Sequence, residues 1–323
     1  MDFVSKLDPE LAPVLDTFPP ELITAIGDDP PTARAMFTQM TAAMTDMLPP
    51  TDVTKEKRVI AGPGGDLEVV IYQPTEEAPR AGLLWIHGGG YIIGSAEDDA
   101  SCISFAENVG CTVVSVEYRM APDVTYKESL ADCFAALKWM VAHADELGVD
   151  KKRIAIGGAS AGGGLTAALA LYNRDHDGVD IAFQWLIYPM IDDTHETASG
   201  YEVTHPSVWN RDVSLKAWKM YLGDEYGTDN VSPYGAPFRA TDLSGLPPAY
   251  VVVGTEDLFR DEDIEYAKRL MAAGVPTELE VYAGMFHGGE SFAPMAGISQ
   301  RMRAGYNAAL KRALAKKENI PAT

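Results

Sequence analysis

One serine stands in a sequence context that could make it a nucleophile. Ser160 lies within Gly157–Gly163, a heptad that contains the pattern Gly-x-Ser-x-Gly. The apolar run Arg-Ile-Ala-Ile precedes it and Leu-Thr-Ala-Ala-Leu-Ala-Leu follows it, so we predict a strand, a sharp turn and a helix. Such a crowded turn exposes the serine hydroxyl above a sheet, and the helix N-terminus favours developing negative charge. The alternative is a small-residue connection without chemistry, which the two flanking elements disfavour.

A serine hydroxyl of ordinary pKa is a weak nucleophile and needs a general base. Among six histidines, His287 is the best candidate because it follows the last predicted strand, in the string Tyr-Ala-Gly-Met-Phe-His-Gly-Gly. That position lies at the carboxyl edge of the sheet, where ligands bind in open α/β folds. Four other histidines are predicted to be ordinary surface or structural residues: His143 in a helix, and His176, His195 and His205 in loops or in a cap.

The third member of such a site is a carboxylate that fixes the tautomer and the orientation of the histidine. It should lie between the serine and the histidine along the chain. The predicted strand Tyr250–Gly254 runs directly into Thr-Glu-Asp-Leu-Phe-Arg-Asp. We predict that Asp257 is this carboxylate, with Glu256 as the alternative, and that Asp261 caps the helix that follows.

A glycine-rich loop could supply hydrogen-bond donors to the reacting carbonyl. The string His-Gly-Gly-Gly-Tyr follows the predicted strand Leu-Leu-Trp-Ile, and glycine lets backbone N–H groups face a substrate without an intervening side chain. A tetrahedral oxyanion needs such donors, each worth about 3 kcal/mol. We predict the amides of Gly89, Gly90 and Ala161 as an oxyanion hole, with Gly88 as an alternative donor. A turn that binds nothing, or phosphate, is the competing interpretation, although no phosphate-loop pattern supports it.

The remaining chain alternates strands with helices. A hairpin is predicted first, over Thr54–Ile60 and Leu67–Gln73, around the turn Gly-Pro-Gly-Gly. Further strands are predicted over Gly82–Ile86, Thr112–Tyr118, Arg153–Gly157, Ile181–Tyr188, Tyr250–Gly254 and Thr277–Tyr282. Helices are predicted over Asp98–Val109, Ser129–Leu147, Ala161–Tyr172, Asp261–Ala273 and Ile298–Leu314. This alternation indicates an α/β fold with a mostly parallel central sheet and helices on both faces.

Two segments depart from the alternation and predict a cap. Residues 1–50 read as helical, and Met36–Leu48 carries one apolar stripe that Pro49-Pro50 should end. This helix either packs on the core or lines an apolar pocket. Residues 189–246 are rich in turn residues and aromatics, with one helical piece near Val213–Tyr221, and are predicted as a cap insertion. The catalytic domain then comprises residues 51–188 and 247–323.

The motifs occur in an order that resembles the hormone-sensitive lipase family of esterases. They are His-Gly-Gly-Gly-Tyr, Tyr-Arg-Met-Ala-Pro, the serine heptad, Tyr188-Pro189, Asp-Leu-Phe-Arg-Asp and Gly-Met-Phe-His-Gly. The resemblance extends from about residue 55 to the end. It implies a capped α/β-hydrolase fold, a serine carboxylesterase acting on short-to-medium acyl esters with no cofactor or metal, and a homodimer formed through a sheet edge or the last helix.

Three positions depart from the usual pattern of that family. Ala159 precedes the serine where the family usually has Asp or Thr, Leu258 follows the aspartate in place of Pro, and Gly289 replaces a common Phe. None of these changes removes a catalytic group. They bear on hydrogen bonding at the serine turn and on substrate preference. Two other functions stay open: an amidase or deacetylase on the same triad, and a non-catalytic binding protein on the same fold.

Net charge and composition limit the kinds of partner that this protein is expected to bind. The net charge of −21 argues against nucleic acid, which needs a basic face, and disfavours anionic membranes and substrates. The three cysteines lack metal or disulfide spacing and are predicted to be buried core residues. No signal peptide is evident in Met1–Leu22, and no run approaches eighteen apolar residues. We therefore expect a cytoplasmic protein whose partner is a small-molecule ester.

Overall fold

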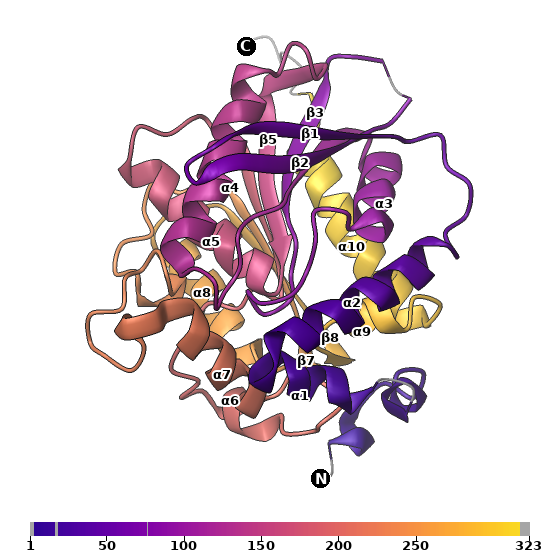
Figure 1. Cartoon of the computed structure of the whole chain (residues 1–323), viewed down its shortest axis with the longest axis vertical. Helices are drawn as coiled ribbons and strands as arrows, with labels where there is room; N and C mark the ends of the chain where they lie inside the picture. Colours follow the sequence, from indigo (N-terminus) through magenta and orange to yellow (C-terminus); the bar gives the residue numbers. More distant parts are fainter. Residues whose placement is uncertain (1–2, 17–18, 76, 317–323) are drawn as a thin grey trace, which may run out of the picture.

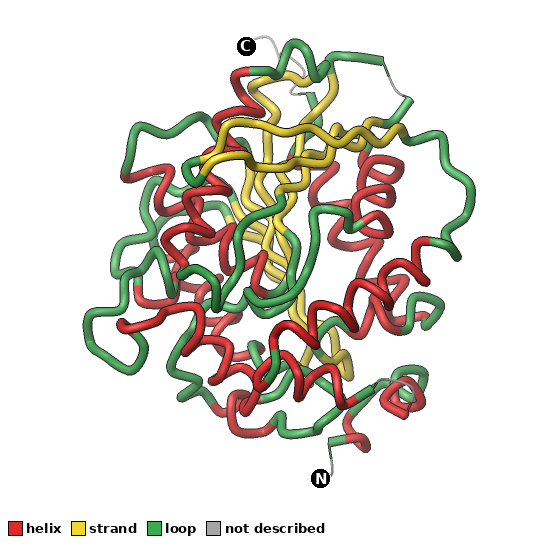
Figure 2. The backbone as a smooth tube through the Cα atoms, viewed as in Figure 1, coloured by secondary structure: helices red, strands yellow, loops and turns green. Residues whose placement is uncertain are grey.

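The computed structural model describes residues 3–16, 19–75 and 77–316. At its centre lies one eight-stranded sheet in the order β1-β2-β4-β3-β5-β6-β7-β8 (Figures 1 and 2). The strands are β1 (Thr54–Gly62), β2 (Gly65–Gln73), β3 (Arg80–Ile86), β4 (Cys111–Val116), β5 (Val149–Ala159), β6 (Phe183–Ile187), β7 (Ala249–Glu256) and β8 (Thr277–Phe286).

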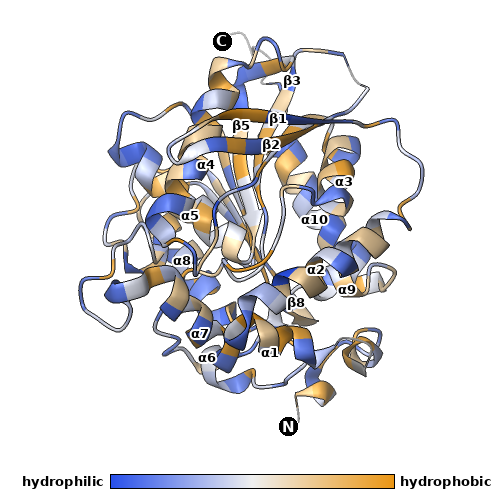
Figure 3. Cartoon of the chain, in the orientation of Figure 1, coloured by the Kyte–Doolittle hydropathy of each residue, from blue (hydrophilic) through white to orange (hydrophobic). Residues whose placement is uncertain are grey.

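The sheet is antiparallel at one edge and parallel elsewhere. β1 and β2 form the predicted hairpin, and β2 also runs antiparallel to β4. The remaining pairs are parallel: β4 with β3, β3 with β5, β5 with β6, β6 with β7, and β7 with β8. β4 is buried along its whole length, as expected of a strand covered on both faces, and its small polar residues Thr112 and Ser115 are buried with its valines. Figure 3 shows apolar residues along the inner strands.

Five long helices cover the two faces of the sheet. They are α3 (Asp99–Val109), α4 (Tyr126–Ala142), α5 (Ala161–Asp175), α8 (Arg260–Ala272) and α10 (Gly297–Ala313). In Figure 1, α3 and α10 lie on one face, and α4, α5 and α8 lie on the other. One of these helices joins β3 to β4, β4 to β5, β5 to β6 and β7 to β8. The predicted α/β-hydrolase architecture, with helices on both faces of a mostly parallel sheet, is confirmed.

The other helices and turns gather at one end of the sheet (Figure 1). They are α1 (Pro20–Asp28), α2 (Pro30–Thr45), α6 (Ala198–Glu202), α7 (Arg211–Leu222), α9 (Gly289–Phe292) and short 3-10 turns at Val4–Lys6, Ala12–Asp16, Gly223–Glu225 and Pro237–Arg239. α1 packs on α7, where Gly27 allows a close approach to the side chain of Lys216. Lys216 Nζ pairs with Asp28 at 2.9 Å. The N-terminal helices and the segment after β6 therefore contact each other.

The Met-rich helix differs from its prediction. α2 ends at Thr45, before Pro49-Pro50, and only its Ala33 is fully buried. Met36, Phe37 and Met40 pack against the core, whereas Met44 is 36% exposed and Met47, beyond the helix, is 76% exposed. The predicted apolar stripe is therefore wrong at its C-terminal end, because the chain leaves the core before the apolar residues stop.

The prediction that Asp261 is the N-cap of the following helix is also wrong. α8 begins one residue earlier, at Arg260, and its N-cap position is Phe259, with no side-chain cap hydrogen bond. Asp261 instead accepts a hydrogen bond from the backbone N–H of Ser199 at 2.8 Å and pairs with Arg260. This carboxylate therefore ties the segment after β6 to the start of α8.

The three cysteines are free and buried, as predicted. Burial raises the pKa of the Cys102 and Cys133 thiols, which keeps them protonated and unreactive. Among the described residues, no helix combines the length and apolar character that a bilayer crossing requires. In the same part of the chain, no group of three or more His, Cys, Asp and Glu side chains could hold a metal ion.

Candidate active site

The serine turn joins β5 to α5 with no intervening loop. Ser160 has φ 58° and ψ −122°, a conformation that L residues rarely adopt. Its N–H donates to Ile187 O at 2.9 Å, which anchors the turn to β6. A Cβ at Gly158 would collide with the Gly162 carbonyl, and one at Gly162 would collide with the Ile86 carbonyl. The glycines of the motif are therefore required by close backbone approach.

The structure brings the three predicted residues into one hydrogen-bonded chain. Ser160 Oγ lies 2.8 Å from His287 Nε2, and His287 Nδ1 lies 2.8 Å from Asp257 Oδ2. A carboxylate can only accept, so Nδ1 carries the proton and Nε2 is free to accept from the serine. This is the arrangement in which a histidine serves as general base toward a hydroxyl.

The three groups are largely withdrawn from solvent. Asp257 is 1% exposed, Ser160 8% and His287 9%. Asp257 Oδ1 accepts from Phe259 N at 2.9 Å, so both carboxylate oxygens have a donor. Glu256, the alternative carboxylate, lies within 4.0 Å of Lys6 and accepts from the neighbouring Thr255 hydroxyl. The hydrogen bond to the histidine is therefore made by Asp257.

Two aromatic rings hold the imidazole between them. The rings of Tyr188 and Phe259 meet His287 edge-on, with centroids at 4.7 and 4.9 Å. The Tyr188 hydroxyl donates to Glu290 Oε1 at 2.5 Å, and burial raises the pKa of the Glu290 carboxyl. Sequence reasoning did not single out Glu290. Its position three residues after His287 was the one available signal.

The glycine loop after β3 has a left-handed backbone. Gly89, Gly90 and Tyr91 have φ of 113°, 63° and 67°. The Gly89 carbonyl accepts from Ile92 N at 3.1 Å and from Ile93 N at 3.0 Å. Within the described chain, the Gly89 and Gly90 amides donate no backbone hydrogen bond.

The third predicted donor belongs to the serine turn. Ala161 is the first residue of α5, where an N–H has no partner inside the helix. Gly88, the alternative donor, lies against the turn, because a Cβ there would approach the Ala159 carbonyl at 2.8 Å and Ser160 Cβ at 3.4 Å.

One cap side chain reaches this loop. The Trp209 ring lies directly on Gly90, where a Cβ would collide with it, and its centroid is 6.4 Å from that of His287. Trp218 is fully buried and instead packs against Tyr91, at 5.5 Å between centroids. Of these two tryptophans, Trp209 is the one that lies near His287 and the glycine loop.

The other four histidines lie elsewhere. His143 and His176 stack on aromatic rings of their own helices, and His205 stacks on Phe3. His195 is fully buried, its Nε2 lies 2.8 Å from a serine hydroxyl, and burial lowers its pKa to about 3. Among the described residues, no hydrogen bond connects any of the four to Ser160.

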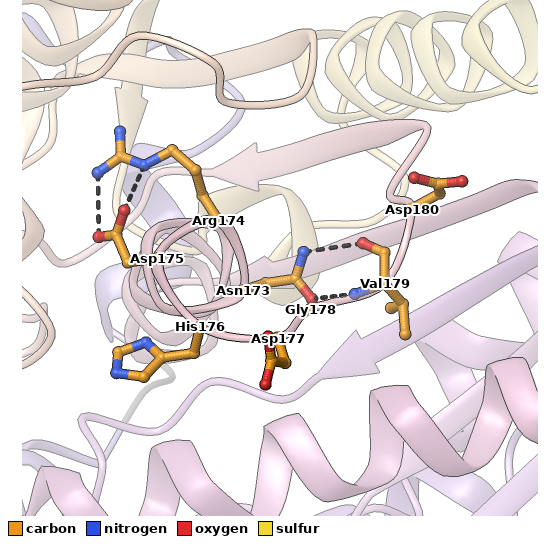
Figure 4. Close-up of a pocket in the computed structure, with 8 residues that line it drawn as sticks. All are labelled: Asn173, Arg174, Asp175, His176, Asp177, Gly178, Val179 and Asp180. Carbon is orange, nitrogen blue, oxygen red and sulfur yellow. Dashed lines mark hydrogen bonds and ion pairs between the residues drawn. The ribbon is translucent and has the colours of Figure 1, made fainter.

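Two hollows lie outside the serine turn. One, of about 690 Å³, is formed by the consecutive residues Asn173–Asp180 (Figure 4). There the Asn173 side chain bonds both backbone groups of Val179, and Arg174 pairs with Asp175. The other, of about 240 Å³, lies between α1 and α7 and is lined in part by Asn210, next to Trp209.

Comparison with known proteins identifies the family. The family described as alpha/beta hydrolase fold matches residues 83–290. The chain belongs to the α/β hydrolase family. This α/β hydrolase is 34% identical to the esterase LipI of Mycobacterium tuberculosis over 87% of each chain. It is also 34% identical to the carboxylesterase NlhH of that organism, over 95% of this chain and 96% of the relative.

Solved structures of esterases match this hydrolase along nearly its whole length. A bacterial heroin esterase is 41% identical, with a TM-score of 0.92 over 98% of this chain and 100% of that one. The esterase LipW from Mycobacterium marinum is 33% identical, with a TM-score of 0.82. The family resemblance predicted from the ordered motifs is confirmed.

Proposed function

We propose that this protein is a serine carboxylesterase that hydrolyses short-to-medium acyl esters through an acyl-enzyme intermediate. The observation that carries the proposal is the chain of two 2.8 Å hydrogen bonds from Ser160 through His287 to Asp257. Carboxylic ester hydrolysis as the reaction class agrees with the esterases and carboxylesterases that match most of the chain.

In the acylation step, Ser160 Oγ attacks the ester carbonyl carbon while its proton passes to His287 Nε2. The carbonyl π electrons move to oxygen and form a tetrahedral oxyanion, and the buried Asp257 stabilises the imidazolium. When the intermediate collapses, the bond to the alcohol oxygen breaks and His287 returns the proton to that oxygen. The alcohol leaves, and the acyl group remains on the serine.

The second half-reaction uses the same groups with water. His287 Nε2 takes a proton from water, whose oxygen attacks the acyl carbon, and the second oxyanion collapses to release the acid and restore the serine. We assign the Gly89, Gly90 and Ala161 amides as donors to both oxyanions. Among the described residues these amides donate no other backbone hydrogen bond, so they remain free to donate to a substrate oxygen, which supports this assignment.

The size and charge of the substrate follow from the surroundings of the serine. We assign residues 1–50 and 189–246 to a cap over the catalytic domain of residues 51–188 and 247–323, and the contact between α1 and α7 supports this division. Trp209 brings an apolar wall to the oxyanion loop. With a net charge of −21, a small neutral ester is the expected partner, rather than nucleic acid or an anionic membrane.

Replacing the nucleophile tests the proposal. We expect Ser160→Ala to lower kcat for p-nitrophenyl butyrate by roughly 10⁶-fold, because the triad acts as a unit. Its melting temperature should stay close to that of the wild type. The matched control is Ser244→Ala, in the exposed loop before β7, which should keep full activity. A tenth of wild-type activity in Ser160→Ala would contradict the assignment, and faster cleavage of a matching anilide than of the ester would favour an amidase.

A further inference from the structure

One arginine of the cap reaches the loop that carries the oxyanion donors. Arg34, on α2, donates from Nε to Ile92 O and from Nη2 to Ala121 O, each at 2.8 Å. Its Nη1 pairs with Asp123 at 2.6 Å. α2 lies beside the loops that follow β3 and β4 (Figure 1). The guanidinium thus bridges two loops, whose bound residues lie 58 and 87 positions after Arg34 in the sequence.

The direction of the Gly90 N–H depends on the turn that Arg34 holds. Because a peptide is planar and trans, its C=O and N–H point in opposite directions. The Gly89 carbonyl is held by the amides of Ile92 and Ile93, so the Gly90 N–H points away from that turn. Ile92, whose N–H binds the Gly89 carbonyl, gives its own carbonyl to Arg34.

The neighbouring peptide is fixed in the same way. Gly88 O lies 2.9 Å from His87 Nδ1, and since a carbonyl only accepts, the imidazole donates. This bond orients the Gly89 N–H. The loop is also tied to the second carbonyl that Arg34 binds, because Ala121 N donates to Tyr91 O at 2.9 Å.

We infer that Arg34 is a positioning residue for the oxyanion donors, so that docking of α2 is coupled to catalytic competence. This inference rests on the proposed esterase function. Of the three contacts that Arg34 makes, the ion pair to Asp123 is a minor one, because the Asp123 side chain is 69% exposed and exposed ion pairs contribute little. The two charge-assisted bonds to backbone carbonyls are the stronger contacts.

The experiment compares Arg34→Met with two matched controls. Arg34→Met keeps an apolar stem and removes all three contacts. Asp123→Asn removes only the exposed ion pair. Asp29→Ala removes the N-cap of α2, where the carboxylate accepts from Thr32 N, and so loosens the same helix without touching either carbonyl. Arg34→Lys retains a cation that can reach one carbonyl but cannot hold both in a fork.

The readouts separate oxyanion binding from substrate binding. Steady-state kinetics with p-nitrophenyl butyrate give kcat and KM. A butyl trifluoromethyl ketone gives Ki for a mimic of the oxyanion, because the serine oxygen bonds to its carbonyl carbon, the proton passes to His287 and the carbonyl oxygen becomes anionic. We expect Arg34→Met to lower kcat and raise Ki by about 10- to 100-fold, less than complete loss of a donor, with KM changed by less than about threefold.

The controls decide between positioning and a structural role. Arg34→Lys should regain part of kcat, while Asp123→Asn and Asp29→Ala should keep wild-type kcat and Ki, even where Asp29→Ala lowers the melting temperature. Wild-type kcat in Arg34→Met, or an equal loss of kcat in Asp29→Ala, would overturn the inference. If Arg34→Met does not fold, an unchanged Ki in Arg34→Lys would overturn it. A wild-type protein without esterase activity would instead refute the proposed function.

Discussion

At the scale of single residues, one of the rings that pack on His287 is hydrogen-bonded to a buried carboxyl. Tyr188 packs edge-on against the ring and donates its hydroxyl to Glu290. Glu290 is 2% exposed, its second carboxylate oxygen has no partner in the described structure, and burial raises its pKa. The raised pKa favours the protonated form of Glu290, which binds Tyr188, whereas Asp257 accepts a hydrogen bond from the imidazole itself.

Stability as a function of pH tests the protonation of Glu290. A carboxyl whose folded pKa is raised binds more protons in the native than in the unfolded state, so its contribution to stability falls as pH rises from its unfolded pKa, about 4.3, toward the folded one. Glu290→Gln has no such proton and can still accept from Tyr188. We expect its free energy of unfolding, relative to that of the wild type, to improve between pH 4 and pH 8 in urea titrations.

The control for that titration is a carboxyl with the opposite shift. Asp150 is half-buried, and hydrogen bonds from Lys152 N and from Arg153 hold its pKa below the ordinary value. In Asp150→Asn the relative stability should therefore decline, slightly, as pH rises. A Glu290→Gln variant whose relative stability is flat or declines over the same range would show that the native carboxyl is already ionised.

At the scale of elements, the turn between β5 and α5 depends on glycine at positions of close approach. A Cβ at Gly162 would collide with the Ile86 carbonyl, which belongs to the backbone of a neighbouring strand. We expect Gly162→Ala to lower the free energy of unfolding by about 1–3 kcal/mol, as overpacked cores do. Esterase activity should fall as well, because Ser160 lies two residues away on the same turn. Urea denaturation and kinetics with p-nitrophenyl butyrate measure both effects.

Another glycine at a helix start provides the comparison for that variant. Gly297 begins α10, and the nearest atom to an added Cβ is a flexible carboxylate oxygen at 3.3 Å. Gly297→Ala should be neutral or slightly stabilising, since it mainly restricts the unfolded chain. Equal stability of the two variants would mean that the turn can adjust to a methyl group, contrary to the close approach described above.

The sequence predicted these elements well where local pattern and local chemistry agree. The hairpin, the parallel strands, the covering helices and the serine turn all follow from periodicity and glycine placement. The end of α2 and the role of Asp261 were predicted incorrectly, because contacts with distant segments decided them. The hydrogen bonds of Arg34 to Ile92 and of Tyr188 to Glu290 could not be predicted. Each joins residues more than 50 positions apart, and no sequence motif contains both partners.

At the scale of the whole molecule, the proposed cap is expected to limit what can reach the serine. Ser160 and His287 are each less than a tenth exposed, and the Trp209 ring lies on Gly90, 6.4 Å from the His287 ring between centroids. A true lipase presents an open apolar face to a lipid surface, whereas here the serine is enclosed and the net charge of −21 gives no attraction to anionic interfaces. An esterase limited by chain length fits this arrangement better.

A series of p-nitrophenyl esters from C2 to C16 tests the enclosure. Each methylene that fits should add up to about 0.8 kcal/mol of burial, close to a fourfold gain in kcat/KM, and methylenes that do not fit should add nothing or clash. We expect kcat/KM to peak at roughly C4–C8 and to fall beyond about C10. Trp209→Ala, which removes the indole from the loop, should move the peak to longer chains, whereas Trp139→Ala, on α4, should leave it in place. Efficiency that still rises at C16, or a jump in rate above the solubility limit of the ester, would mean that the cap opens to a lipid surface.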